Sequence, residues 1–258
     1  MNFKELINKI SYYISVPKCV CCGEIIDIDD RALCKTCLAQ YNSIKEKTCS
    51  VCKNPYYKCL CVNDYLDKRY IHKLVKVFRY KSCVDDEKIP SNELIYNIKR
   101  GYRRDLVEFI ADEVTKAIKD SKLNLKNYVI TSVPRSLSRK AKYGIDHSAK
   151  LSEEIAKRLD IQYIRPLKSK SKRAQKKTHG EERFLNAVFD YRFDYDLSNF
   201  NVIIFDDIVT TGASMGACAL LLKGLGAKRI IGASISVAFS DEYTPLSRED
   251  RFNKRKNP

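Results

Sequence analysis

Closely spaced cysteines constrain the first quarter of this 258-residue chain. Nine of its eleven cysteines lie between Cys19 and Cys61, and eight of these form three C-x-x-C pairs and one C-x-C pair. A C-x-x-C turn points two thiolates at one centre, and two such turns complete a tetrahedral site of four sulfur atoms suited to zinc. The paired cysteines fall into two sets: Cys19, Cys22, Cys34 and Cys37, and Cys49, Cys52, Cys59 and Cys61. They predict two structural zinc sites in a small double zinc-ribbon domain over residues 18–63, whose folding free energy the metal would supply.

Alternative uses of these cysteines stay open at this point. The thiols can instead form disulfides or carry out redox chemistry, although disulfides are rare in the cytoplasm. Cys21 lies beside Cys22 and can replace it as a ligand, and the pairs can interleave between two sites instead of filling them in order. A closed site of four thiolates has no open coordination position, so we expect no catalysis at the metal. Cys83 and Cys218 stand alone and are expected to be ordinary core or loop thiols.

The net charge of the chain is +16, with a pI near 9.3. Such a charge favours anionic partners, namely phosphate ligands, nucleic acid or an acidic membrane surface. A basic surface that serves only solubility is the alternative. Residues 1–17 repeat apolar side chains at helical spacing and predict an amphipathic helix. No apolar run reaches the roughly 20 residues that span a bilayer, and the N-terminus lacks the pattern of a signal peptide, so we expect a cytoplasmic protein.

Short apolar segments alternate with amphipathic segments in the rest of the chain. Strands are expected at residues 128–133, 161–164, 201–205 and 230–239, and helices at 106–118, 151–159 and 213–225. This alternation predicts an α/β fold over residues 64–240, with a parallel sheet flanked by helices. The polar segment 82–100, which contains Pro90, predicts a loop or insertion, and residues 241–258 predict a charged flexible tail.

An apolar strand that ends in two acids is the most informative feature of this second region. Four apolar residues, 202–205, precede Asp206 and Asp207. Ligands of open α/β sheets bind at the carboxyl ends of the strands. The two carboxylates suit the vicinal hydroxyl groups of a ribose, directly or with Mg²⁺ nearby. We therefore expect a sugar at the end of this strand.

The turn after these acids suits a phosphate group. A helix N-terminus presents unpaired N–H groups and the positive end of the helix dipole. The turn and the first helical residues add hydroxyl donors and a glycine that lets the backbone approach closely: Thr210, Thr211, Gly212, Ala213 and Ser214. The alternative is an ordinary capped helix that binds no ligand. The order of two acids, two threonines and a glycine favours a sugar-phosphate site.

These residues resemble a known motif. Type I phosphoribosyltransferases bind phosphoribosyl pyrophosphate (PRPP) through four apolar residues, two acids, two variable residues and Thr-Thr-Gly, and residues 202–212 are similar to that pattern. Further stretches resemble the ComF family: residues 133–136, Arg139 and 144–148 its pyrophosphate loop, residues 175–177 and 183–187 its flexible loop, and the cysteine-rich N-terminus its zinc ribbon. One departure is the sequence of residues 144–147, Gly-Ile-Asp-His, where the family commonly has Gly-aromatic-Asn/Asp-Gln.

The resemblance implies a type I phosphoribosyltransferase-like fold and a set of roles. Asp206 and Asp207 would hold the ribose 2′- and 3′-hydroxyls, residues 210–214 would hold the 5′-phosphate, and Arg135 would approach the pyrophosphate of PRPP bound with Mg²⁺. A flexible lid would contain Lys176, Lys177, Arg183 and Asn186. The family is linked to DNA uptake in natural transformation, which implies single-stranded DNA or DNA-uptake proteins as partners.

The basic segment 168–177 has six basic residues in ten and no acid. It can be a mobile lid that neutralises a pyrophosphate. It can also contact the phosphate backbone of DNA, or be a solvated loop. Oligomeric state is not encoded in any motif of this sequence.

Two functions therefore stand at the level of sequence. The first is a phosphoribosyltransferase, in which catalytic Asp206 and Asp207 favour positive charge on the ribose and Mg²⁺ stabilises the leaving pyrophosphate. The acceptor of the phosphoribosyl group has no recognisable motif. The second is a non-catalytic, PRPP-responsive module that binds DNA or protein.

Overall fold

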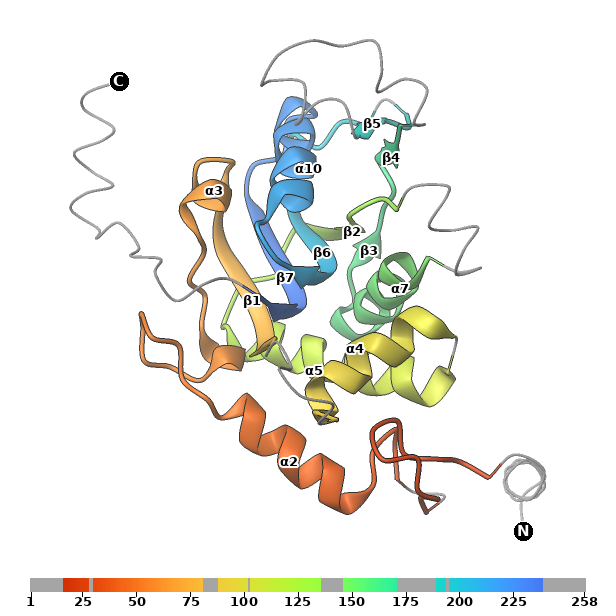
Figure 1. Ribbon diagram of the computed structural model, residues 1–258. Helices are drawn as coiled ribbons and strands as arrows, with labels where there is room; N and C mark the ends of the chain where they lie inside the picture. The colour runs from red at the N-terminus through yellow and green to blue at the C-terminus, as the bar shows by residue number, and fades with distance from the viewer. Residues whose placement is uncertain are drawn as a thin grey trace.

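The computed structural model describes residues 16–27, 30–80, 88–101, 103–135, 146–170, 189–193 and 195–238 (Figure 1). Several predicted features lie outside these residues: most of the N-terminal helix, Cys83, Arg139, the lid residues Lys176, Lys177, Arg183 and Asn186, and the tail 241–258.

Five parallel strands form the central sheet, in the order β1–β7–β6–β2–β3. Their bounds are Ile71–Arg79 (β1), Ile230–Val237 (β7), Asn201–Val209 (β6), Tyr128–Ser132 (β2) and Gln162–Tyr163 (β3). All positions of β2 and β7 are buried, as expected for central strands of a parallel sheet that is covered on both faces. A separate antiparallel pair joins β4 (Leu167–Ser169) to β5 (Phe189–Tyr191).

Helices cover both faces of the sheet (Figure 1). Alternate residues of β6 point to opposite faces, so Ile203 and Phe205 enter one apolar core, while Val202 and Ile204 enter the other. The first core contains α4 (Pro90–Arg100), α5 (Arg104–Asp120) and α7 (His147–Leu159), and the second contains α10 (Ala213–Gly224) and the short α3 (Asp64–Asp67). This arrangement confirms the predicted α/β fold with a parallel sheet flanked by helices.

Two predictions about individual elements were wrong. Residues 82–100 were expected to be a loop, but α4 occupies Pro90–Arg100, because proline is favoured in the first turn of a helix, where no N–H partner is needed. The strand expected at 201–205 continues to Val209, because Asp206 and Ile208 pair with Ser234 and Ser236 of β7. The two acids therefore belong to the strand itself and do not follow it.

The cysteine-rich segment packs against the sheet and its helices. It contains α2 (Lys35–Lys45) and the short 3₁₀ helix η1 (Tyr56–Lys58). The fully buried ring of Tyr41 lies edge-on to Phe78 of β1 and Phe109 of α5, with ring centroids 5.9 and 5.5 Å apart. The segment thus shares an apolar core with the α/β region, and the predicted domain boundaries stay a prediction.

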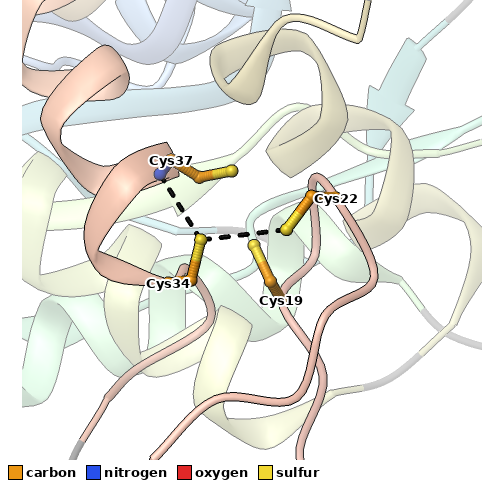
Figure 2. Close-up of side chains that lie close together, drawn as sticks. All are labelled: Cys19, Cys22, Cys34 and Cys37. Carbon is orange, nitrogen blue, oxygen red and sulfur yellow. Dashed lines mark hydrogen bonds between the residues drawn. The ribbon is translucent and has the colours of Figure 1, made fainter.

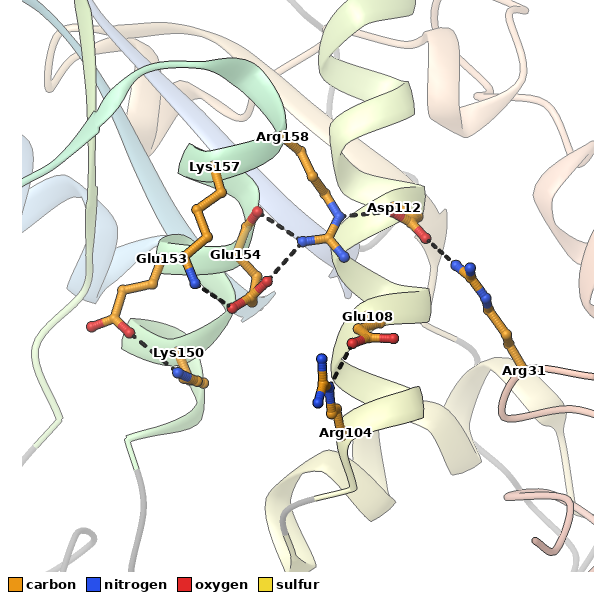
Figure 3. Close-up of polar contacts among 9 residues, drawn as sticks. All are labelled: Arg31, Arg104, Glu108, Asp112, Lys150, Glu153, Glu154, Lys157 and Arg158. Atoms are coloured by element: carbon orange, nitrogen blue, oxygen red, sulfur yellow. Dashed lines mark hydrogen bonds and ion pairs between the residues drawn. The ribbon is translucent and has the colours of Figure 1, made fainter. Parts of the chain in front are cut away.

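An ion pair joins the first part of this segment to α5, and a second one joins α5 to α7 (Figure 3). Asp112 of α5 accepts from Arg31 Nη1 at 3.0 Å and from Arg158 Nε of α7 at 2.7 Å. A second contact places Lys45 Nζ and the hydroxyl of Tyr41 on Glu113 Oε2. None of the helices described in the structure combines the length and the apolar character that a membrane span requires.

Candidate functional site

The first cysteine cluster consists of Cys19, Cys22, Cys34 and Cys37 (Figure 2). All four sulfur atoms lie within 4.8 Å of one another, and those of Cys22 and Cys34 are 3.8 Å apart. A tetrahedral site with Zn–S bonds of about 2.3 Å requires sulfur atoms about 3.8 Å apart, so this group fits a zinc ion. Gly23 makes the tight turn after the first pair, with φ +80°, and its N–H donates to the carbonyl of Cys19 at 3.0 Å.

The second cluster consists of Cys49, Cys52, Cys59 and Cys61, whose sulfur atoms also lie within 4.8 Å of one another. Its first pair repeats the turn of the first cluster, with Lys53 at φ +60° in the position of Gly23. Cys59 is only 1% exposed, whereas Cys22 of the first cluster is exposed. The donor set again fits a closed zinc site.

Cys21 is outside both clusters. Its thiol lies 3.8 Å from the carbonyl oxygen of Lys88, at the start of the α4 region. The structure therefore brings together the two sets in the order of the sequence, with Cys22 and not Cys21 in the first. Cys218 is fully buried in α10, in agreement with an ordinary core thiol.

A buried lysine accompanies the second cluster, and the sequence analysis missed it. Lys76 of β1 is 2% exposed, and its Nζ donates to the carbonyl oxygens of Cys61 at 2.7 Å and Leu74 at 3.3 Å. No carboxylate of the described residues forms an ion pair with it. A hydrogen bond from the Cys61 side chain, followed by the Lys76 charge, lowers the pKa of the Cys59 thiol to about 4 despite burial. A lysine within the apolar run 74–78 was the available signal.

The acid pair forms the second candidate site. Asp207 is 6% exposed, and its Oδ2 lies 2.9 Å from Arg135 Nη2 and 3.1 Å from Lys99 Nζ. Arg135, which follows β2, also donates to Ser148 Oγ of α7 at 3.4 Å. The structure thus places Arg135 beside Asp207, and it adds Lys99, which lies in the segment that was expected to be a loop.

The two acids have different protonation tendencies. Burial, followed by the charge of Asp207, raises the pKa of Asp206 well above its usual range. Burial also acts to raise the pKa of Asp207, but Lys99 and then Arg135 outweigh it and lower that pKa. The pair therefore combines a carboxylate that ionises readily with an acid that favours its neutral form.

The turn after β6 is open to solvent. Thr210, Thr211, Ala213 and Ser214 are exposed, and Gly212, with φ +84°, is the N-cap residue that precedes α10. The hydroxyl of Thr211 accepts from the Ala213 N–H at 3.3 Å. The N-terminus of a twelve-residue helix is therefore accessible directly after the acid pair. We call residues 210–214 the phosphate loop.

His147 lies in the first turn of α7, near the acid pair. It is 2% exposed, and its ring lies close enough to the backbone of Lys99 for that backbone to influence its pKa. Burial, followed by the charge of Arg135, lowers its pKa. His147 thus links the start of α7 to the end of α4, whose Lys99 contacts Asp207.

A separate cavity of about 330 Å³ lies between the cysteine-rich segment and the start of α4. Its lining includes Ile44, Lys47, Tyr56, Tyr80, Ile89 and Ser91. None of the predicted ligand-binding residues lines it, so the candidate ligand site consists of the acid pair and the phosphate loop at the carboxyl end of β6.

No protein-family model matches the chain, and no curated protein gives a significant match. Solved structures with a similar arrangement include a hypoxanthine phosphoribosyltransferase from Staphylococcus aureus (14% identity, TM-score 0.33, 52% of this chain and 71% of that chain). Others are a purine phosphoribosyltransferase from Pyrococcus horikoshii (16%, 0.31, 57% and 95%) and an adenine phosphoribosyl transferase from Trypanosoma brucei, in complex with AMP, pyrophosphate and ribose-5-phosphate (16%, 0.32, 66% and 81%). Similarity at this level defines no substrate for the present chain.

Proposed function

We propose that this chain binds PRPP with Mg²⁺ at the acid pair and the phosphate loop, as a ComF-like phosphoribosyltransferase. The observation that carries the proposal is the exposed start of α10 immediately after two acids whose pKa values are shifted in opposite directions. Phosphate binds at helix N-termini, and a carboxylate beside a neutral acid suits a pair of sugar hydroxyls.

The ribose would lie against Asp206 and Asp207. Both cations that contact Asp207 use its Oδ2, so Oδ1 lies outside these two ion pairs and can accept a hydrogen bond from a hydroxyl group. Carboxylate oxygens also suit Mg²⁺, which would supply charge neutralisation at the pyrophosphate when bound. The acids would favour positive charge that develops on the ribose as the bond to pyrophosphate breaks.

The two phosphate ends would contact different elements. The 5′-phosphate would accept hydrogen bonds from the N–H groups and hydroxyls of the phosphate loop. Arg135, which holds Asp207, would also contact the pyrophosphate, and the predicted lid residues Lys176, Lys177, Arg183 and Asn186 would close over it. Transfer to an acceptor would release pyrophosphate, and the proposal leaves the chemical class of that acceptor open.

Calorimetric titration with PRPP and Mg²⁺ tests the binding step. Hydrogen bonds to charged groups contribute about 1.5–3 kcal/mol each, so we expect Asp207→Asn to weaken binding by roughly 10–100-fold. Asp206→Asn replaces an acid that favours its neutral form and should weaken binding less. Asp120→Asn, at the exposed end of α5, is the matched control and should bind as the wild type does. Absence of PRPP binding by the folded wild-type protein would rule out the proposal.

A second candidate function is a PRPP-responsive module that binds single-stranded DNA in natural transformation. Cations lie over partly exposed aromatic rings in several places, including Arg100 over Tyr96 at 3.7 Å and Arg69 over Tyr65 at 3.5 Å. Nucleobases stack on such rings while cations contact the phosphates. Pyrophosphate release with a panel of amines and bases supports the transferase, whereas salt-dependent DNA binding without release supports the module.

A further inference from the structure

The second cysteine cluster is one residue away from a direct contact with the phosphate loop. After Cys61 and the buried Val62, the side chain of Asn63 makes two hydrogen bonds. Its Oδ1 accepts from the N–H of Leu66 at 3.0 Å and caps α3, and its Nδ2 donates to the carbonyl oxygen of Thr211 at 3.0 Å. One amide group therefore holds both α3 and the phosphate loop.

A close apolar contact reinforces this connection. Leu66 of α3 is fully buried, and a Cβ atom added to Gly212 would lie only 2.7 Å from its Cγ. One turn further along α10, a Cβ atom at Gly216 would lie 2.6 Å from Cδ of Arg69 and 3.0 Å from the ring of Tyr65. The start of α10 thus packs against residues 63–69 without space for side chains at its two glycines.

The other end of this connection depends on the second cluster. The carbonyl of Leu60, between Cys59 and Cys61, accepts from the N–H of Leu74 in β1 at 3.2 Å, and the Cys61 carbonyl accepts from Lys76. Four thiolates around Zn²⁺ carry a net negative charge, which the buried Lys76 ammonium can balance. Since α3 has only four residues, it has little stability of its own and depends on the groups that hold its ends.

We propose that the metal ion of the second cluster positions the phosphate loop through residues 61–66, so that metal occupancy of this cluster controls the affinity for a ribose phosphate. The first cluster has no such connection within the described residues, because its described contacts are with α4, α5 and the Cys34–Cys37 turn. The statement about affinity rests on the proposed function, whereas the statement about the loop does not. Asn63 and Leu66 are positioning residues in this account.

Amide hydrogen exchange of residues 211–216, measured without ligand on the zinc-loaded full chain, tests the loop. Cys61→Ser should leave one zinc ion per chain by native mass spectrometry and speed exchange in this segment by roughly tenfold. Cys22→Ser, its matched control, removes a ligand of the first cluster and should leave this segment unchanged. Equal exchange of residues 211–216 in Cys61→Ser and the wild type would overturn the inference.

Variants that keep both metal ions provide a second test. This test remains valid if Cys61→Ser does not fold. Leu66→Ala and Asn63→Ala should retain two zinc ions and still speed exchange of residues 211–216. Both should also weaken PRPP binding in calorimetry, by roughly tenfold for one lost hydrogen bond or contact. If the wild type binds no PRPP, the proposed function fails, but the exchange data still test whether the second cluster positions the phosphate loop. Unchanged exchange in both variants refutes the connection.

Discussion

The two cysteine clusters offer the same four thiols to a metal but lie in different surroundings. The first has an exposed ligand, Cys22, and its segment is joined to α5 by the solvent-exposed ion pair of Arg31 and Asp112. The second contains the nearly inaccessible Cys59, a buried lysine and a short connection to the phosphate loop. A metal ion bound by the same four thiols would therefore stabilise different structural elements in the two clusters.

This difference teaches that the ligand pattern alone does not define what a metal site does. A metal ion at the first cluster would fasten the N-terminal segment to the helices that cover one face of the sheet. At the second cluster it would fix the residues that support the start of α10, on the other face. The first role affects stability, and the second would affect stability and ligand binding together.

The largest effect is expected from removing a buried ligand. Zinc binding contributes about 10–16 kcal/mol in zinc-finger peptides, comparable with the whole net stability of a typical domain. We therefore expect Cys59→Ser to abolish cooperative thermal unfolding, whereas Cys22→Ser, at an exposed position that water can occupy, lowers the Tm and retains a single transition. Calorimetric unfolding of zinc-loaded proteins measures both. Equal losses in the two variants would remove the contrast between the clusters.

Removing the buried lysine should weaken the second site without touching a ligand. Lys76→Met leaves the negative charge of a metal–thiolate cluster unbalanced, and changes next to the ligands typically cost 10–100-fold in metal affinity. Competition with a chromogenic chelator should show this loss for one of the two zinc ions only. Lys73→Met, an exposed lysine of the same strand, is the control. If Lys76→Met releases zinc no more readily than Lys73→Met, the lysine does not balance the cluster.

The acid pair in β6 also contains a group that opposes folding when it ionises. The raised pKa of Asp206 means that the folded state favours the neutral form of this side chain. The stability that this preference contributes is therefore lost as pH rises through the folded pKa. Asp206→Asn should therefore raise the Tm near pH 8 and change it little near pH 4, by roughly 2–4 °C for each ~1 kcal/mol relieved. The opposite order, with a larger gain at acid pH, would contradict the assigned shift.

Local patterns predicted much of this molecule. Short-range spacing predicted the two clusters in chain order, but it left open whether Cys21 replaces Cys22 and whether the pairs interleave between two sites. Apolar periodicity was sufficient for α5, α7 and α10 and for strands β2, β3, β6 and β7 to within a few residues at each end. The acid pair and phosphate loop were recognisable because a contiguous segment contains all of their residues.

Contacts between distant segments were not predictable in the same way. The role of Lys76 depends on its contact with the carbonyl oxygen of Cys61. The role of Lys99 depends on its ion pair with Asp207, which is more than one hundred residues away in the chain. Pro90 was interpreted as a loop signal although it begins α4, since proline is common in both positions. The antiparallel pair of β4 and β5 joins two three-residue strands, which are too short to show a period.

The smallest effect on stability is expected from removing the ion pair of Arg31 and Asp112, which joins the segment of the first cluster to α5. The side chains of Arg31 and Asp112 are 62% and 47% exposed, and such pairs contribute about 0.2–1 kcal/mol. Arg31→Ala should therefore lower stability slightly at about 0.1 M salt and less at about 1 M, where screening is stronger. Arg104→Ala, which removes a pair with Glu108 inside α5, controls for a general effect of charge (Figure 3).

A double-mutant cycle of Arg31 with Asp112 isolates the coupling between these two side chains, because Asp112 still pairs with Arg158 when only Arg31 is replaced. A coupling of several kcal/mol would mean that these ion pairs, and not the metal, fasten the first segment to the helices.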